Sequence, residues 1–447
     1  MLKQKTANYL LLILSAALYI AMGYGIQRHQ TLPLFACYYS LFILFFLMVR
    51  HHETITEHEL KFWVFTGIFF RALLLFSVPA LSDDFYRFIW DGRLLAAGYH
   101  PFAEVPSFYM THQMAIPGID QELFDKLNAK GTFTVYPPFS QFIFWLSVIL
   151  SPRSVYGSML VMKVILFLFE IGTLWIVAKT LRQLTLPSSN ILLYSLNPLV
   201  ILELTGNLHF EGVMIFFLLL AVLLLNREQT RWSALAYSLS VCSKLIPLLL
   251  MPLFVRQLGW KKTMVYWFVT IAFTFFLFLP LLNMEIIHGL STGLGYYFQR
   301  FEFNASIYYL VREAGHLIFG FNVIQVAGPL LALTAMVLIL TLAFRKLPSI
   351  FPNRLDAGFF RLAVWSLFVY FLSTAILHPW YIITLLALSL FTPYRFPLVW
   401  TAVIFLSYAG YSPGRFEENL LLVGLEYLVV IAYLLYETVW TKKLSHF

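Results

Sequence analysis

Apolar runs of about 20 residues recur from one end of this 447-residue chain to the other. A helix of that length crosses a hydrocarbon layer about 30 Å thick. The chain is 60% hydrophobic and 12% charged, whereas a soluble domain is about half apolar and a quarter charged. The short alternating segments typical of a membrane barrel do not occur in the sequence. The sequence therefore predicts an all-α polytopic membrane protein.

The runs predict a bundle of about 11–13 transmembrane helices in one domain over residues 1–447. Two stretches do not fit a simple crossing, because 138–150 is too short and 232–256 is interrupted by Lys244 and Pro247. We expect both to be re-entrant half-helices inside the bundle, since such backbone must be covered by protein or line a cavity. The predicted spans lie near 8–26, 32–50, 62–81, 157–179, 190–205, 210–226, 264–282, 323–344, 361–377, 380–392, 396–411 and 419–440.

Clusters of lysine and arginine lie between the apolar runs, and the positive-inside rule places such clusters in the cytoplasm. With Lys3 and Lys5 inside, three crossings bring residues 82–135 outside as an acidic loop with amphipathic helices. A second external loop is expected at 283–305. Nearly every basic cluster then falls on one side. The net charge of +8 thus indicates retained cytoplasmic loops, and no nucleic-acid partner is expected.

The first external loop begins SDDFYRFIWDGRLLAAGYHPF at 82–102. Ionised groups at the wall of a helical bundle are costly and usually functional, which favours a functional role for Asp83 and Asp84. The alternative is structural. The two acids would then cap a helix that follows Ser82, and Arg87 would pair with Asp91 one helical turn later.

A second polar group interrupts the apolar stretch NPLVILELTGNLHFEGVM at 197–214. Asn207, His209 and Glu211 gather at its outer end, on the same external side as the two aspartates in the predicted topology. A lone histidine there is more often a satisfied interfacial residue. Because three polar residues lie together here, a substrate-binding role and a structural role are equally favoured.

A third group is LHPWY at 377–381. Pro379 can open a helix directly after His378, and Trp380 and Tyr381 are natural residues of the membrane interface. The functional alternative is that His378 donates to a phosphate and that Trp380 or Tyr381 packs on a sugar face or a lipid.

Several cations lie in or near the predicted bundle. Arg300, and also Arg312, are external in this topology and could clamp a phosphate. Lys244 and Arg71 lie at membrane depth, where each must pair with a carboxylate or line a cavity.

The ordered set of motifs resembles the GT-C superfamily of polytopic glycosyltransferases, and most of all its bacterial mannosyltransferases that use polyprenyl-phosphate mannose. It comprises DDFYRFIWDGRLLAAGYHPF after an early span, YPPF at 136–139, NPLVILELTGNLHFEG, SKLIPLLLMP at 243–252 and HPWY at 378–381. Two features depart from the family. Two additional spans precede the acidic loop, and Glu211 stands where relatives often carry Asp, which leaves its role open.

The resemblance implies a GT-C-like bundle whose catalytic base is an acid of the first external loop. This acid maps onto Asp84, which directly precedes an aromatic residue, with Asp83 as the second choice. The substrate-binding residues that we expect around it are Arg87, Asp91, Tyr136, Asn207, His209, Glu211, Arg300, His378, Trp380 and Tyr381.

The expected reaction moves a hexose, most simply mannose, from a polyprenyl-phosphate donor to an extracytoplasmic acceptor hydroxyl with inversion. No cofactor is required, although a divalent metal could bridge Asp83, Glu211 and phosphate. The acceptor, whether lipid, glycan or protein, is unassigned. The protein is expected in the bacterial inner (cytoplasmic) membrane, with its active site facing the periplasm or exterior. The alternative is a secondary transporter or flippase of lipid-linked sugars, a class that tends to show paired broken helices in its two halves.

Overall fold

The computed structural model of the chain describes residues 2–344 and 356–440. These residues form helices throughout, apart from loops and one short antiparallel hairpin of β1 (Tyr411–Ser412) and β2 (Arg415–Phe416). The expected all-α class is confirmed. The longer helices are α1 (Leu2–Tyr24), α2 (Thr31–Val49), α3 (Glu57–Leu73), α4 (Asp84–Ala96), α7 (Pro138–Leu150), α8 (Val155–Gln183), α11 (Glu211–Leu225), α12 (Thr230–Ser243), α13 (Phe254–Phe278), α14 (Met284–Gln299), α15 (Ile307–Phe319), α16 (Ile324–Phe344), α17 (Ala357–Ser373) and α20 (Leu420–Leu435).

Shorter helices connect these elements. The short α-helices are α5 (Pro106–Thr111), α6 (Gln121–Asp125), α9 (Leu192–Ser195), α10 (Pro198–Val200), α18 (Ile382–Ser389) and α19 (Phe396–Val403). The 3₁₀ helices are η1 (His52–Thr54), η2 (Ser188–Ile191), η4 (Ile246–Leu253), η5 (Leu279–Leu281), η6 (Pro379–Tyr381) and η7 (Ile404–Gly410), and the π-helices are η3 (Ile201–Gly206) and η8 (Tyr436–Trp440).

Within the described residues, six helices are long and apolar enough to cross a membrane, or seven if one sharply bent pair counts as a span. The protein is therefore an integral membrane protein. The estimate of about 11–13 crossings also counted shorter and broken helices as spans. Prolines at 198, 379 and 397 each open a short helix, because proline fits the first turn but lacks the N–H that an interior position needs. The six long helices are Thr6–Tyr24, Thr31–Thr54, Val155–Gln183, Ile246–Leu281, Ile324–Phe344 and Leu420–Val439.

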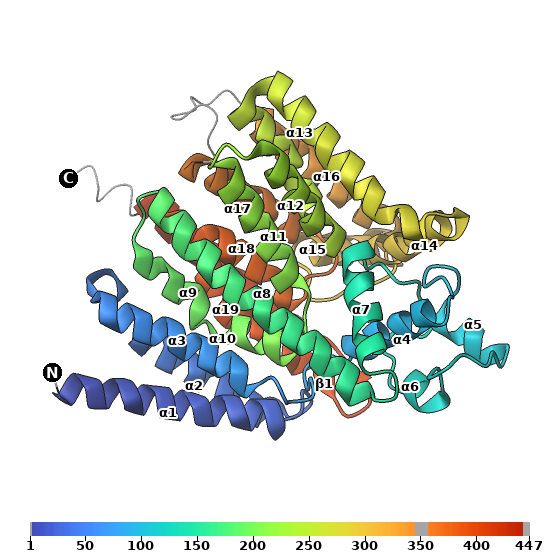
Figure 1. Cartoon of the computed structure of the whole chain (residues 1–447), viewed down its shortest axis with the longest axis horizontal. Helices are drawn as coiled ribbons and strands as arrows, with labels where there is room; N and C mark the ends of the chain where they lie inside the picture. Colours follow the sequence, from blue (N-terminus) through green and yellow to red (C-terminus); the bar gives the residue numbers. More distant parts are fainter. Residues whose placement is uncertain (1, 345–355, 441–447) are drawn as a thin grey trace.

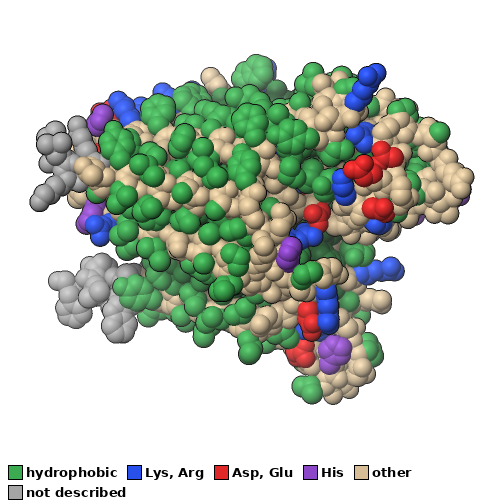
Figure 2. Space-filling model, turned by 90° about the horizontal axis from the view of Figure 1, so that it is seen from below, with side chains coloured by type: hydrophobic (Ala, Val, Ile, Leu, Met, Phe, Trp, Pro, Cys, Tyr) green, Lys and Arg blue, Asp and Glu red, His purple; other side chains and the backbone are tan. Residues whose placement is uncertain are grey.

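Helices α1, α2 and α3 pack together at one side of the bundle, and α11 packs against both α8 and α12 in its middle. The acidic segment with α4, α5 and α6 lies at the end opposite to the start of α1 (Figure 1). Figure 2 shows hydrophobic side chains over much of one face, with Asp and Glu side chains gathered toward the end that carries α4 to α6. The charge distribution agrees with a bundle whose acidic end lies outside the lipid.

Helix α4 is more buried than an amphipathic surface helix. Phe88 stacks on Phe144 of α7 at a ring separation of 4.6 Å, and Trp90 is fully buried. At Gly92 a side chain would collide with the Phe144 carbonyl, so this glycine sets how closely α4 and α7 cross. Asp84 at the start of α4 is thus held by a rigid helix pair.

The two predicted half-helices are both short helices. Helix α7 has 13 residues and begins at Pro138. Helix α12 ends at Ser243, because Lys244 has extended backbone (φ −154°, ψ 146°), and η4 follows it. The predicted interruption at Lys244 is therefore confirmed, and the re-entrant path of both segments stays a prediction.

A buried ion pair fixes α3 to α8. Arg71 Nε donates to Glu170 Oε2 at 3.1 Å, and neither side chain is exposed. Arg71 Nη1 also donates to the carbonyls of Gly67 and Ser195, and the Tyr194 hydroxyl donates to Glu170 at 2.8 Å. Arg71 is thus paired with a carboxylate inside the protein, as the sequence predicts. This ion pair fixes the position of α3, the helix that precedes the acidic segment.

Removal of one partner of the Arg71–Glu170 ion pair should lower the stability of the protein. We expect Arg71→Met to lower the free energy of unfolding by about 3–5 kcal/mol, because it leaves the Glu170 carboxylate buried without a counter-ion. The double variant Arg71→Met/Glu170→Leu should recover most of that loss. Thermal unfolding in lipid nanodiscs measures both. A double variant less stable than the single one would contradict this account.

Candidate functional site

The site is built around a break in an apolar span. The two arms, Pro198–Gly206 and Glu211–Leu225, meet at an angle of 111°. Between them Leu208 is fully buried at a φ of +65°, a conformation that costs a bulky residue about 1–3 kcal/mol. Strained turns and π-helical segments such as η3 concentrate at functional sites. The break places His209 and Glu211 inside the bundle.

Asn207 ties this break to the acidic segment. Its Oδ1 accepts from the backbone N–H groups of Ala80 and Leu81, at 3.2 and 3.0 Å, and its Nδ2 donates to the Leu202 carbonyl. The polar atoms of Asn207 are therefore engaged with backbone. Asn207 acts here as a residue that positions the chain before Asp83, and its predicted contact with substrate stays a prediction.

The two adjacent aspartates have different partners. Asp83 forms an ion pair with Arg28 from the loop between α1 and α2, and the Arg28 guanidinium lies 4.8 Å above the Tyr411 ring. Asp84 instead accepts a hydrogen bond from Asn128 Nδ2 at 2.8 Å. Asp83 is therefore paired with a cation. Asp84 is the acid that interacts with the polar cluster around Lys244.

Burial raises the pKa of Asp84, whereas the hydrogen bond from Asn128 and the positive charge of Lys244 oppose that shift. Burial also raises the pKa of Tyr297 to about 12, and the Asp84 carboxylate adds to this shift. A general base works best when its pKa lies near the working pH. An aspartate with a raised pKa beside a lysine is suited to accept a proton.

Tyr136 shows how the cluster is assembled. Its pKa is raised by burial and by four neighbouring groups, of which Asp84 is the largest contributor, followed by Tyr297, Glu211 and Tyr381. These residues come from α4, α14, α11 and η6. Helix α14 approaches the acidic segment closely because Gly289 and Gly293 face the backbone near Phe102 and Phe133.

Lys244 also lies in this cluster, although it is not among the substrate-binding residues that the sequence predicts. Its ammonium forms an ion pair with Glu211 and lies 4.9 Å from the centre of the Tyr381 ring. The sequence predicts that a lysine at this depth must pair with a carboxylate or line a cavity, and Glu211 supplies the carboxylate.

Both predicted histidines lie parallel to the Trp380 indole. The His209 and Trp380 rings are 3.6 Å apart at 16°, and the His378 and Trp380 rings are 4.4 Å apart at 9°. His209 Nε2 lies 3.3 Å from Glu203 Oε2, and the Tyr408 hydroxyl donates to the same carboxylate. The second and third sequence groups are therefore brought together.

A backbone strap holds His378. Phe303 N donates to the Ala375 carbonyl at 3.0 Å, and Leu377 N donates to the Phe303 carbonyl at 2.8 Å. The Phe303 ring lies 4.6 Å from the His378 ring. The segment that the sequence predicts as a second external loop thus reaches the site through its backbone.

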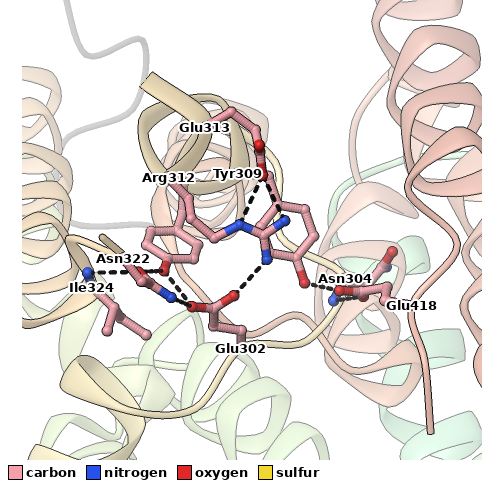
Figure 3. A network of polar contacts seen from close by, with 9 residues as sticks. Glu302, Asn304, Tyr309, Arg312, Glu313, Asn322, Ile324 and Glu418 are labelled. Atoms are coloured by element: carbon pink, nitrogen blue, oxygen red, sulfur yellow. Dashed lines mark hydrogen bonds and ion pairs between the residues drawn. The ribbon is translucent and has the colours of Figure 1, made fainter. Parts of the chain in front are cut away.

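Polar contacts on both sides of Phe303 anchor this strap (Figure 3). Arg312 donates to Glu302 at 2.7 Å and to Glu313 at 2.9 Å. On the other side, Asn304 N and the Tyr309 hydroxyl both donate to Glu418. Arg312 is thus engaged by carboxylates. Arg300, at the end of α14, has an exposed side chain, and its predicted phosphate contact stays a prediction.

Arg87 and Asp91 form the predicted pair one turn apart, with Arg87 Nε 2.8 Å from Asp91 Oδ1. Arg87 also donates to the carbonyls of Ala129 and Thr132. These contacts fix the loop that carries Asn128. The structural alternative for this pair is confirmed, and a direct contact of either residue with substrate stays a prediction.

The structure thus brings together most, but not all, of the predicted residues. Asp83 pairs away from the cluster, and Asn207 is engaged with backbone. Among the residues that the structure describes, no three His, Cys, Asp or Glu side chains are grouped to hold a metal ion. The residues that meet at the site are Asp84, Tyr136, His209, Glu211, Lys244, Tyr297, His378, Trp380 and Tyr381.

The half-buried His378 ring predicts a loss of stability in acid. Burial, and then the charge of Lys244, lower the pKa of His378 to about 3. As the pH falls below the unfolded value of about 6.5, the unfolded chain binds a proton that the folded chain excludes, so stability falls by up to about 1.4 kcal/mol per pH unit.

We therefore expect the wild type to lose more thermal stability than His378→Asn when the pH is lowered from about 7 to about 5. Unfolding in nanodiscs at both pH values measures this difference. Equal losses in the two proteins would show that His378 is not held neutral by the fold.

Comparison with known proteins identifies the family to which the chain belongs. A family described as alpha-(1→6)-mannopyranosyltransferase, N-terminal domain, matches residues 13–259, which is more than half of the chain and includes Asp84, His209, Glu211 and Lys244. No curated protein matches the chain. The family confirms the resemblance to mannosyltransferases and shows that the protein is a glycosyltransferase of the membrane. The chain belongs to the MptA/MptB family of alpha-(1→6)-mannopyranosyltransferases.

Proposed function

We propose that the protein is a GT-C-type hexosyltransferase that moves mannose from a polyprenyl-phosphate donor to an acceptor hydroxyl on the external side of the membrane. The family supports the mannosyl group. The family description also suggests an α-(1→6) linkage. An inverting displacement forms this linkage directly from a β-linked donor. The acceptor is a lipid, glycan or protein that presents a hydroxyl.

Asp84 is the general base in this proposal. It takes the proton of the acceptor hydroxyl while that oxygen forms a bond to the anomeric carbon. The bond between that carbon and the phosphate oxygen breaks, and its electron pair leaves with the polyprenyl phosphate. General-base assistance is worth about 10²–10⁴ in rate.

One observation carries this assignment: Asp84 is the aspartate of the pair that faces the polar cluster. Asp83 is neutralised by Arg28, whereas Asp84 keeps a hydrogen bond from Asn128 and lies within the field of Lys244. Burial raises the pKa of Asp84, which makes its carboxylate a stronger proton acceptor than an ordinary aspartate. Asp83 is the second choice.

The aromatic residues support a sugar-binding role. Trp380, Tyr381, Tyr297 and Tyr136 surround the charged groups, and such rings offer apolar faces with polar edges. The carboxylates Asp83 and Glu211 each have a cationic partner. We therefore propose that the reaction needs no cofactor, and that chelation with EDTA leaves turnover unchanged.

We further propose that the protein lies in a bacterial inner membrane with this site on the periplasmic side. The acidic end of the bundle lies opposite to the start of α1, and the basic loops of the sequence favour a cytoplasmic start. A flippase of lipid-linked sugars remains the rival function. It would move the donor across vesicles without forming a new glycosidic bond.

The test compares two amide substitutions. With polyprenyl-phosphate mannose and α-mannoside or lipid acceptors, Asp84→Asn should lower turnover by about 10²–10⁴, because the amide cannot accept the proton. Asp83→Asn should retain most activity. Mass spectrometry of the product measures both, and the exposed Asp125→Asn serves as the matched control.

Wild-type rates in both Asp83→Asn and Asp84→Asn would remove the base assignment. Movement of the lipid-linked sugar across vesicles with no transfer to any acceptor would favour the flippase instead.

A further inference from the structure

The two residues of the Lys244–Glu211 ion pair differ in their exposure to solvent. Glu211 is the first residue of α11 and its side chain has no exposure, whereas the Lys244 side chain is 15% exposed. Glu211 Oε2 has no hydrogen-bond partner among the described residues. The Lys244 side chain is thus partly accessible, whereas the Glu211 side chain is fully enclosed.

Lys244 carries the positive charge of this cluster. Its charge acts on Asp84 and on His378, and His378 itself is neutral near pH 7 because its pKa is about 3. An anion that enters beside Asp84 therefore meets the Lys244 ammonium. Since Glu211 already holds that ammonium, the entering anion and Glu211 compete for it.

Within residues 2–344 and 356–440, Lys244 is the one cation that forms an ion pair with Glu211. Besides Lys244, the titratable groups that interact electrostatically with Glu211 are Asp84, Glu203, Tyr136 and Tyr381, all of them acids. The charge of Lys244 acts on both His209 and His378. A buried carboxylate that loses its only counter-ion is costly to keep ionised, and it takes up a proton instead.

We propose that Lys244 and Glu211 form an exchange site, in which a phosphodiester takes the Lys244 ammonium and Glu211 binds a proton in return. The inference rests on the proposed lipid-phosphate donor and adds the residue that receives its phosphate. The step is balanced: one anion enters, one proton moves from solvent to Glu211, and no covalent bond changes. When the polyprenyl phosphate leaves, Glu211 releases the proton and the ion pair forms again.

The test measures protons and binding together. A short-chain polyprenyl phosphoryl mannose is added to the full chain in nanodiscs, in weak buffer with a pH indicator. This phosphodiester keeps one negative charge near neutral pH. We expect uptake of up to one proton per bound donor, and an affinity that rises as the pH falls, by at most about tenfold per pH unit.

Variants separate the two residues. Glu211→Gln should bind the donor with no proton uptake and with an affinity independent of pH. Lys244→Met should weaken binding at least about tenfold, and Lys244→Arg should restore part of that loss. Lys61→Met, which removes an exposed lysine paired with Glu57, is the matched control and should bind as the wild type does.

Methyl mannosyl phosphate, which has the same phosphodiester without the lipid chain, distinguishes the source of the phosphate. Proton uptake with both ligands would support recognition of any mannosyl phosphodiester, and uptake with the lipid-linked form alone would support a lipid donor. Wild-type binding without proton uptake would overturn the exchange site and leave the proposed donor intact. No donor binding at all would contradict both proposals.

Discussion

The burial of opposite charges at a broken apolar span determines the rest of this structure. Glu211 opens α11 after a bend of 111°, and Lys244 ends α12 beside it. Neither charge could remain alone in an apolar bundle, because desolvation of an unpaired ion costs several kcal/mol. Together they form the polar centre of a bundle whose other contacts are largely hydrophobic, and they lie next to the acid that we assign as the base.

The surrounding helices bring the acidic segment to this centre. The buried Arg71–Glu170 pair fixes α3 to α8, and Asn207 binds the backbone that follows α3. Asp83 forms an ion pair with Arg28. The neighbouring Asp84 instead interacts with the polar cluster around Lys244. Two consecutive residues with the same chemistry thus have different roles because their partners come from different parts of the chain.

The features that depend on residues close together in the sequence could be predicted. The apolar runs identified a polytopic helical protein, the spacing of Arg87 and Asp91 gave their ion pair, and Lys244 marked a helix break. The pairs Lys244–Glu211 and Arg28–Asp83 could not be predicted, because each joins segments that meet only after the bundle has packed. The structure describes six helices that are long enough to cross alone, or seven with the bent pair, together with shorter apolar helices, so the predicted number of about 11–13 crossings stays a prediction.

The most direct test of this account is a cryo-electron microscopy structure in nanodiscs with a non-transferable polyprenyl phosphonate of mannose. The account predicts that the phosphonate lies within contact of the Lys244 ammonium, with the mannose between it and the Asp84 carboxylate. A headgroup bound at the opposite end of the bundle, with Lys244 and Asp84 both left untouched, would contradict it.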